Sequence, residues 1–240
     1  MATGLTRITD DLVRALAPLR FAPPVTHVYN PLVYAHAPHT AYLTRYGRGK
    51  KHSVWLGMNP GPFGMAQTGV PFGEIAMVQR FLGIDAPVGK PEHEHPKRPI
   101  QGFACPRSEV SGRRVWAFVE ARFGTAAAFF RQHYVHNFCP LVFMDEGGRN
   151  LTPDKLPAHE RAPLFEICDR ALREVVRVVG AQRVIAVGHF AETRARAALG
   201  DEMAILRIPH PSPASPLANR GWAEAAERAL GDSLSDSLGA

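Results

Sequence analysis

The sequence has few cysteines and no long apolar run. Three cysteines, Cys105, Cys139 and Cys168, occur among 240 residues, and no two of them form a Cys-x-x-Cys pair. A small, odd number of cysteines argues against a disulfide framework, and the missing pair argues against a zinc ribbon or an iron–sulfur cluster. No apolar stretch reaches the roughly 18 residues of a membrane-spanning helix, and the first residues show no signal peptide. We therefore expect a protein of a reducing compartment, the bacterial cytosol and nucleoid or a eukaryotic nucleus, with no membrane partner.

Charge of either sign is moderate. The chain has 28 Lys and Arg against 22 Asp and Glu, a net charge of +6, and 45% hydrophobic residues, which allows a sizeable core. Such a balance fits either an ordinary enzyme surface or a polyanionic partner. Because no repeat or low-complexity linker divides the chain, we expect residues 1–240 to form a single domain, with a frayed tail at about 231–240.

Apolar periodicity predicts strands that alternate with helices. We expect strands at 53–58, 135–141, 183–188 and 203–209, and helices at 5–19, 74–83, 115–123, 126–133, 164–179, 189–199 and 219–230. The segments 21–50, 85–113 and 145–163 should be irregular. This alternation predicts an α/β fold whose parallel central sheet is covered by helices on both faces.

The most unusual segment is 57–74, which follows the first predicted strand. It reads Gly-Met-Asn-Pro-Gly-Pro-Phe-Gly-Met-Ala-Gln-Thr-Gly-Val-Pro-Phe-Gly-Glu and contains no Lys, Arg or Asp. Its glycines allow a close approach of the backbone to a ligand, and its prolines make the loop rigid. A rigid loop with so little charge suits a flat, neutral ligand better than a phosphate or a metal ion.

Three polar residues, Asn59, Asn137 and His210, stand at or near the ends of predicted strands. Because ligands bind at the carboxyl ends of the strands in open α/β sheets, a parallel sheet can bring these distant residues to one edge. Taken singly, each has an ordinary explanation: a turn-forming Asn, a core amide and a loop histidine. Phe72, likewise, can be a plain core residue. Their coincidence with the loop at 57–74 favours a shared binding site.

Other possible sites are weaker. His93 and His95 can suggest a metal site, but a solvated, charged loop explains them better. Cys139 can act as a nucleophile beside a histidine, although a buried structural cysteine is the commoner case. Ser212 lacks the Gly-x-Ser-x-Gly motif of the hydrolase elbow, and segment 57–64 lacks the Lys-Ser/Thr ending of a P-loop.

Two segments carry a family resemblance. Residues 57–74 resemble the first signature of the single-strand-selective monofunctional uracil-DNA glycosylases, a branch of the uracil-DNA glycosylase superfamily, and residues 210–222 resemble the second. Segments 105–112, 135–141 and 148–153 are also similar to this family. The resemblance extends over roughly residues 25–230 and implies a three-layer α/β/α sandwich with a four-stranded, mostly parallel central sheet.

The resemblance implies a DNA glycosylase that takes part in base excision repair. Such an enzyme flips uracil, and also 5-hydroxymethyluracil or other deaminated bases such as xanthine, out of the helix and hydrolyses the N-glycosidic bond. Asn59 would orient the attacking water, and His210 would stabilise the departing base. The residues expected to contact the base are Asn137, Phe72, Gly61, Met65 and Met58. Neither signature contains a lysine that could form a Schiff base, so we expect a monofunctional enzyme that leaves an abasic site. The implied reaction requires no metal or cofactor, and we expect none.

The segment after His210 is where the family inserts a wedge into DNA. The implied DNA contacts are Pro213, Ala214, Ser215 and Arg220, and other candidates for phosphate contacts are Lys97, Arg98, Arg107 and Arg113. Well-known members have an arginine where Ala214 stands here. This departure removes a charge and a long side chain, so it bears on duplex DNA rather than on base cleavage. We expect a monomer.

The sequence is also compatible with rival functions. One is a relative with another preferred base, such as hypoxanthine, and another is a non-catalytic binder of damaged or single-stranded DNA. The presence of both Asn59 and His210 favours an enzyme, because a binder can lose either. A metal hydrolase built on His93 and His95 would lose its activity in a chelator.

Overall fold

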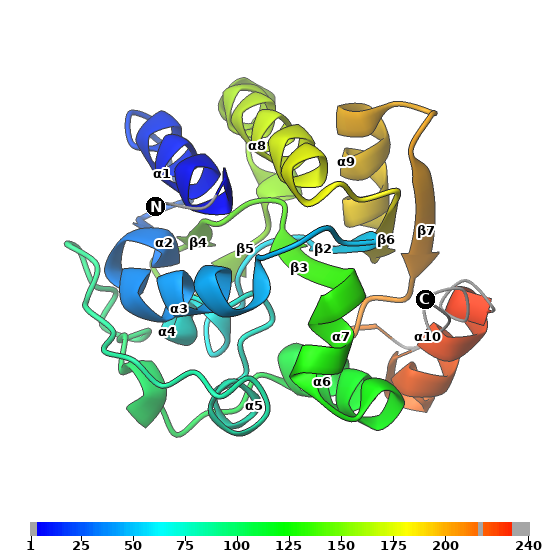
Figure 1. Ribbon diagram of the computed structural model, residues 1–240. Coiled ribbons are helices and arrows are strands. Elements are labelled where there is room, and N and C mark those ends of the chain that lie inside the picture. Colours follow the sequence, from blue (N-terminus) through cyan, green and yellow to red (C-terminus); the bar gives the residue numbers. More distant parts are fainter. Residues whose placement is uncertain (1–3, 216–217, 232–240) are drawn as a thin grey trace.

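The computed structural model describes residues 4–215 and 218–231, and a four-stranded sheet forms its centre (Figure 1). The strands are β2 (Ser53–Gly57), β3 (His133–Asn137), β6 (Arg183–Val187) and β7 (Ala204–Ile208), in the order β3-β2-β6-β7. All neighbouring pairs are parallel, and the register places Gly57 beside Asn137. The carboxyl ends of all four strands therefore meet at one edge of the sheet.

Helices cover both faces of this sheet (Figure 1). One layer contains α1 (Gly4–Leu16), α8 (Ala158–Val179) and α9 (His189–Leu199), and the other contains α6 (Val110–Phe123), α7 (Ala126–Gln132) and α10 (Trp222–Leu230). Strand β2 is buried along its whole length, because a parallel strand packed on both faces has no polar side. The expected α/β/α sandwich with a four-stranded sheet is confirmed, and this sheet is entirely parallel.

The expectation of an irregular segment at 21–50 is wrong. This segment contains β1 (His27–Tyr29), α2 (Pro31–Tyr34) and α3 (His36–Tyr46). A proline is tolerated in the first turn of a helix, where the missing N–H needs no partner, and Pro38 occupies such a position in α3. The Tyr42 hydroxyl of α3 donates a hydrogen bond to the carbonyl oxygen of Val135 (2.7 Å) and accepts one from its N–H (3.3 Å). Helix α3 therefore covers the outer edge of β3.

The segment between β3 and α8 also differs from expectation. Strand β3 ends at Asn137 rather than at residue 141, and the chain then enters a small antiparallel sheet in the order β1-β4-β5. Its other strands are β4 (Val142–Met144) and β5 (Asn150–Leu151). Asn137 is therefore the last residue of β3. Further along the chain, helix α8 begins at Ala158 instead of residue 164, with Pro163 inside it.

The remaining elements are short. They are α4 (Met65–Thr68), α5 (Ile75–Arg80) and the 3-10 helices Gly102–Ala104, Pro153–Lys155 and Ala218–Arg220. The segment 85–113 is irregular as expected up to residue 109, apart from one 3-10 turn, and α6 begins at Val110 rather than at 115. Most of the tail expected to be frayed, residues 232–240, lies outside the described residues. Within the described part of the chain, no helix is long and apolar enough to cross a membrane.

Candidate active site

A cavity of about 360 Å³ opens at the carboxyl edge of the central sheet. Of the residues singled out in the sequence, its wall contains Met58, Asn59, Gly61, Phe72, Asn137, His210 and Pro213. The wall also contains polar residues for which no role was expected from the sequence, namely Glu109, Ser111, Asn150, Thr152 and Ser212. Folding therefore gathers two amides, an imidazole and an aromatic ring from segments that are far apart in the chain.

Asn137 occupies the end of β3 and is only 5% exposed. Its Nδ2 donates a hydrogen bond to the sulfur of Met65 over 3.2 Å. On the neighbouring strand Gly57 lies directly beside it, and a Cβ atom there would collide with Asn137 Oδ1 and approach the Phe72 ring to 2.8 Å. Gly57 therefore leaves the space in which the amide and the ring sit together.

Phe72 is held in a backbone conformation that few residues adopt. Its φ of +52° is the only positive value for a residue other than glycine among the described residues. Such a conformation costs on the order of 1–3 kcal/mol and persists where the surroundings enforce it. Here the Phe72 carbonyl oxygen accepts hydrogen bonds from Trp116 Nε1 (2.9 Å) and from the N–H of Glu74 (2.7 Å). Gly112 packs so closely on the same carbonyl that a Cβ atom would collide with it. These contacts hold the backbone of Phe72 in this conformation.

His210 follows β7 and packs on Gly188, which follows β6 with a φ of +91°. A Cβ atom at residue 188 would lie 3.0 Å from His210 Cβ. The Nδ1 atom of His210 accepts a hydrogen bond from the N–H of Ser212 over 3.1 Å. Burial lowers the pKa of His210 below its ordinary value of 6.5. The imidazole is therefore neutral near pH 7 and carries its proton on Nε2, the nitrogen left to donate to a ligand.

Asn59 is the second residue after β2, just beyond the end of the strand. Its side chain is half-buried, and its Nδ2 donates to the carbonyl oxygen of Leu141 over 3.3 Å. This hydrogen bond orients the amide and leaves Oδ1 as an acceptor. A fixed acceptor in a cavity can hold a water molecule in one orientation, but an amide is too weak a base to take a proton from it.

Among the described residues of the cavity wall, Glu109 is the one with a carboxyl group. It caps the N-terminus of α6, where its Oε1 accepts a hydrogen bond from the N–H of Ser111 over 3.3 Å. Burial raises its pKa above the ordinary range. Gly61 and Gly64 face it, and a Cβ atom at either position would lie 2.9 Å or less from the carboxyl group. Residues 105–112, which include Glu109, are similar to the family in sequence. That similarity does not show that Glu109 packs against the loop that contains Gly61 and Gly64.

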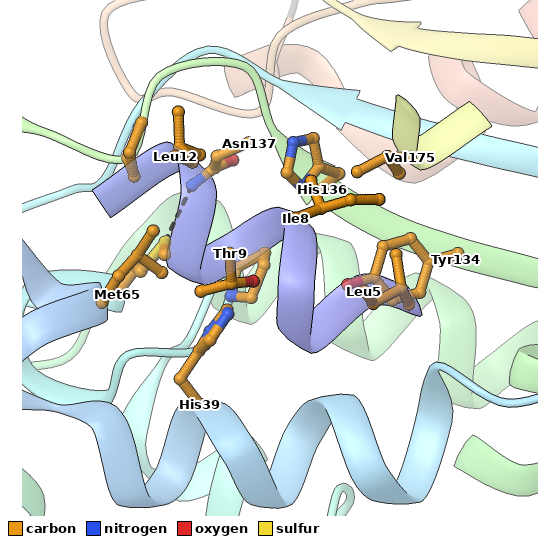
Figure 2. A pocket seen from close by; sticks show the side chains of 13 residues that line it. Leu5, Ile8, Thr9, Leu12, His39, Met65, Tyr134, His136, Asn137 and Val175 are labelled. Carbon is orange, nitrogen blue, oxygen red and sulfur yellow. Dashed lines mark hydrogen bonds between the residues drawn. The ribbon is translucent and has the colours of Figure 1, made fainter. Parts of the chain in front are cut away.

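Met65 does not lie in the wall of this cavity. Its side chain lies behind Asn137 and lines a second, small cavity of about 20 Å³ (Figure 2). His39, His136 and residues of α1 also line that cavity, and the dashed line in Figure 2 marks the contact of Met65 with Asn137. Met65 therefore supports the amide from behind, and the base contact that the resemblance implied for it stays a prediction.

The segment after His210 continues outward from the cavity. Pro213 lies in the wall, whereas Ala214 and Arg220 are exposed and Ser215 is half-buried. The N–H of Ala214 donates a hydrogen bond to Ser212 Oγ over 3.2 Å. The sequence-based assignment of these residues to DNA contacts stays a prediction.

His95 is buried rather than solvated, which corrects the expectation for this loop. Its Nδ1 accepts a hydrogen bond from the N–H of Lys97 over 3.0 Å, and its Nε2 faces the carbonyl oxygens of Asp145 and Glu146 at 3.2 Å each. Both ring nitrogens are thus engaged by the backbone. Across the residues that the structure describes, no group of three or more His, Cys, Asp or Glu side chains could hold a metal ion.

The parallel sheet, the rigid loop at its carboxyl edge and the cavity between two amides and an imidazole define the class of protein. The sequence model of the uracil DNA glycosylase superfamily matches residues 44–229, and the chain belongs to this superfamily.

Individual relatives point to one branch of the superfamily. The chain is 51% identical over 233 residues to the single-strand selective monofunctional uracil DNA glycosylase of Mus musculus, which covers 96% of this chain and 84% of the relative. The protein of the same name from Bos taurus is 48% identical over 229 residues, or 94% of this chain and 83% of the relative. The crystal structure of wild-type Pedobacter heparinus SMUG2 shares the fold, with a TM-score of 0.65, 19% identity and coverage of 96% of both chains. The family resemblance seen in the sequence is confirmed.

Proposed function

We propose that this protein is a monofunctional DNA glycosylase that removes uracil from DNA by hydrolysing the bond between the base and C1′ of deoxyribose. The observation that carries the proposal is the meeting of Asn59, Asn137 and His210 around one cavity of about 360 Å³. This volume lies within the range of roughly 300–1,000 Å³ that is usual for small-molecule sites. A base inside a helix reaches such a cavity only after it leaves the stack.

His210 has the properties needed to stabilise the leaving base. As the glycosidic bond breaks, the sugar becomes oxocarbenium-like and negative charge develops on the uracil, including its O2 atom. The neutral imidazole, fixed by Ser212, presents Nε2–H as a donor to that oxygen. A preorganised donor of this kind contributes about 3 kcal/mol, or on the order of 10²–10³ in rate.

Asn59 supplies the second part of the mechanism. Its Oδ1 accepts a hydrogen bond from the water molecule and aims the lone pair of that water at C1′, while Nδ2 remains tied to Leu141. Because the amide does not remove a proton, the reaction relies mainly on stabilisation of the leaving group.

Asn137 supplies selectivity for uracil. One hydrogen of Nδ2 is directed to Met65, so the other can donate to uracil O4 while Oδ1 accepts from N3–H. Cytosine has an acceptor at N3 and an amino group at C4, which is the reverse pattern. Each mismatched polar group left buried without a partner costs about 1–3 kcal/mol. Phe72 stacks on the ring of the base.

The product is an abasic site. A glycosylase that also cleaves the strand needs an amine in the site to form a Schiff base, and no lysine is among the residues of the described cavity wall. We propose that the same cavity also accepts 5-hydroxymethyluracil and xanthine as substrates.

The partner is DNA inside the cell, bound by a monomer. Residues Pro213, Ala214, Ser215 and Arg220 form the segment proposed to press against the strand from which the base has left. Inserting such a wedge costs a few kcal/mol of stacking. With the short side chain of Ala214 in this segment, single strands should be better substrates than duplexes, because a single strand needs no wedge to stay open.

The test is an assay of base release from oligonucleotides that contain uracil, 5-hydroxymethyluracil, xanthine or hypoxanthine, as single and double strands. Release of uracil from single strands supports the proposal. Binding to these oligonucleotides without release of any base would favour a non-catalytic binder instead.

A further inference from the structure

Phe63 carries two guanidinium groups beside its ring. The Cζ atom of Arg107 lies 4.0 Å from the ring centroid, and that of Arg98 lies 5.5 Å from it. The three residues come from the loop after β2 and from two places in the irregular segment 85–109. An arginine stacked on an aromatic ring loses part of its freedom but keeps its outward N–H groups for a phosphate.

A buried amide holds these segments together. Gln67 is 1% exposed, and its Nε2 donates hydrogen bonds to the carbonyl oxygens of Pro62 (3.1 Å) and Pro99 (3.2 Å). Its Oε1 accepts from the N–H groups of Gln101 (2.8 Å) and Gly102 (3.1 Å). The residue before Phe63 and the residue after Arg98 are therefore fixed to the same side chain.

The cluster of Phe63, Arg98 and Arg107 adjoins the cavity already described. Gly61, two residues before Phe63, lies in the cavity wall, as does Glu109, two residues after Arg107. The Glu109 carboxyl group packs against Gly61 and Gly64, on both sides of Phe63 along the chain. The guanidinium groups therefore stand beside the wall that this carboxyl group and the loop form together.

Neither guanidinium is neutralised within the described part of the chain, where no carboxylate forms an ion pair with Arg98 or Arg107. By contrast, Arg194 is paired with Asp169. Arg107 is exposed, and Arg98 Nε is buried with no hydrogen-bond partner among the described residues. Two fixed, unpaired cations near the mouth of a DNA-base cavity match the charge of a phosphodiester backbone.

We propose that Phe63, Arg98 and Arg107 bind the phosphates of the single strand immediately next to the extruded nucleotide. The inference rests on the proposed function. It assigns to this cluster the part of the strand that enters or leaves on the side of the cavity formed by Gly61 and Glu109. Arginine held by an aromatic ring is well suited to this task because its N–H groups are already ordered before the phosphate arrives.

The test uses single-stranded oligonucleotides that carry one 2′-fluoro-2′-deoxyuridine, whose glycosidic bond resists cleavage. We expect Arg107→Gln to raise the Kd about fivefold at low salt. Loss of one phosphate contact should make the negative slope of the logarithm of the association constant against log salt less steep by ~0.7. Arg98→Gln should act in the same direction. Arg177→Gln, which changes an exposed cation near the C-terminus of α8, is the matched control and should leave the Kd and the slope unchanged.

Shortening the oligonucleotide from either end locates the contact. The ratio of the Kd of Arg107→Gln to that of the wild type should fall to one when nucleotides on one side of the lesion are removed, and persist when those on the other side are removed. A ratio of one with the full oligonucleotide, or a ratio that no truncation changes, would overturn the inference. Failure of the wild-type protein to bind any of these oligonucleotides would instead overturn the proposed function. Unfolding in urea verifies that each variant is folded.

Discussion

The N–H of Ser212 donates a hydrogen bond to Nδ1 of His210 over 3.1 Å, and this contact decides which ring nitrogen carries the proton. A second proton on the ring would turn Nδ1 into a donor that faces another donor. Because burial already lowers the pKa of His210, the neutral form extends below pH 6.5. We predict that kcat/KM for single-stranded uracil DNA stays level from pH 8 to about 6.5 and falls only below that range. An acidic limb centred above pH 6.5, or activity that rises on acidification, would contradict this assignment.

The chemistry and the wedge can be separated by two substitutions. His210→Ala removes the donor to the leaving base, and we expect kcat for uracil release from a single strand to fall on the order of 10²–10³. Ala214→Arg adds a side chain outside the cavity and should change this rate far less, while it improves release from duplex DNA. Comparable losses in both variants on single strands would show that the division between chemistry and wedge is wrong.

A substitution at Gly57 tests whether the positions of Asn137 and Phe72 matter for base recognition, and it removes no polar group. Gly57→Ala places a Cβ atom where Asn137 Oδ1 and the Phe72 ring now lie, so both must shift. A displacement of about 1 Å in a site can cost on the order of 10² in rate. Gly147→Ala is the control, because a Cβ atom there meets only Asp145 Oδ1, at 3.2 Å. Steady-state rates of uracil release measure both, and equal activity of the two variants would refute the role given to Gly57.

Buried histidines should make the fold sensitive to acid. Burial lowers the pKa of His39 and of His136 to about 4 and that of His133 to about 3. An unfolded chain binds these protons from about pH 6.5 downward, whereas the folded protein does not. The free energy of unfolding should therefore be fully present above pH 6.5 and decrease toward pH 4, by up to ~1.4 kcal/mol per pH unit for each histidine.

Urea unfolding between pH 7 and 4.5 measures this slope. His39→Gln should reduce the slope of the unfolding free energy against pH by the contribution of one histidine. His93 is exposed, so His93→Gln should leave this slope unchanged. A slope that is the same in all three proteins would show that burial of the imidazole at residue 39 does not govern the acid response.

The arrangement of the site could be predicted in part from the sequence. The meeting of Asn59, Asn137 and His210 follows from the geometry of a parallel sheet, in which residues at the carboxyl ends of different strands share one edge. The position of Met65 does not follow from such a rule, because only side-chain packing decides whether a residue of the loop lines the cavity or supports Asn137 from behind.

The parts that the sequence did not predict depend on contacts between distant segments. Glu109 lies in the site because it caps α6 and packs on Gly61, which no local pattern records. The expectation of an irregular segment at 21–50 misses helix α3, whose Pro38 falls in a first turn where proline is tolerated. The early end of β3 likewise depends on the pairing of the following residues with β1.

The most direct measurement follows a single-stranded oligonucleotide with one uracil in two parallel incubations with the protein in EDTA, one without and one with sodium borohydride. Alkali is applied only to the sample without borohydride, because borohydride reduces the abasic aldehyde and the strand then resists alkali. We predict release of free uracil, a strand that breaks only on later treatment with alkali, and no protein trapped on the DNA. Loss of base release in EDTA, a covalent borohydride adduct, or an intact base after prolonged incubation would each contradict a cavity in which two amides and a neutral imidazole suffice for the reaction.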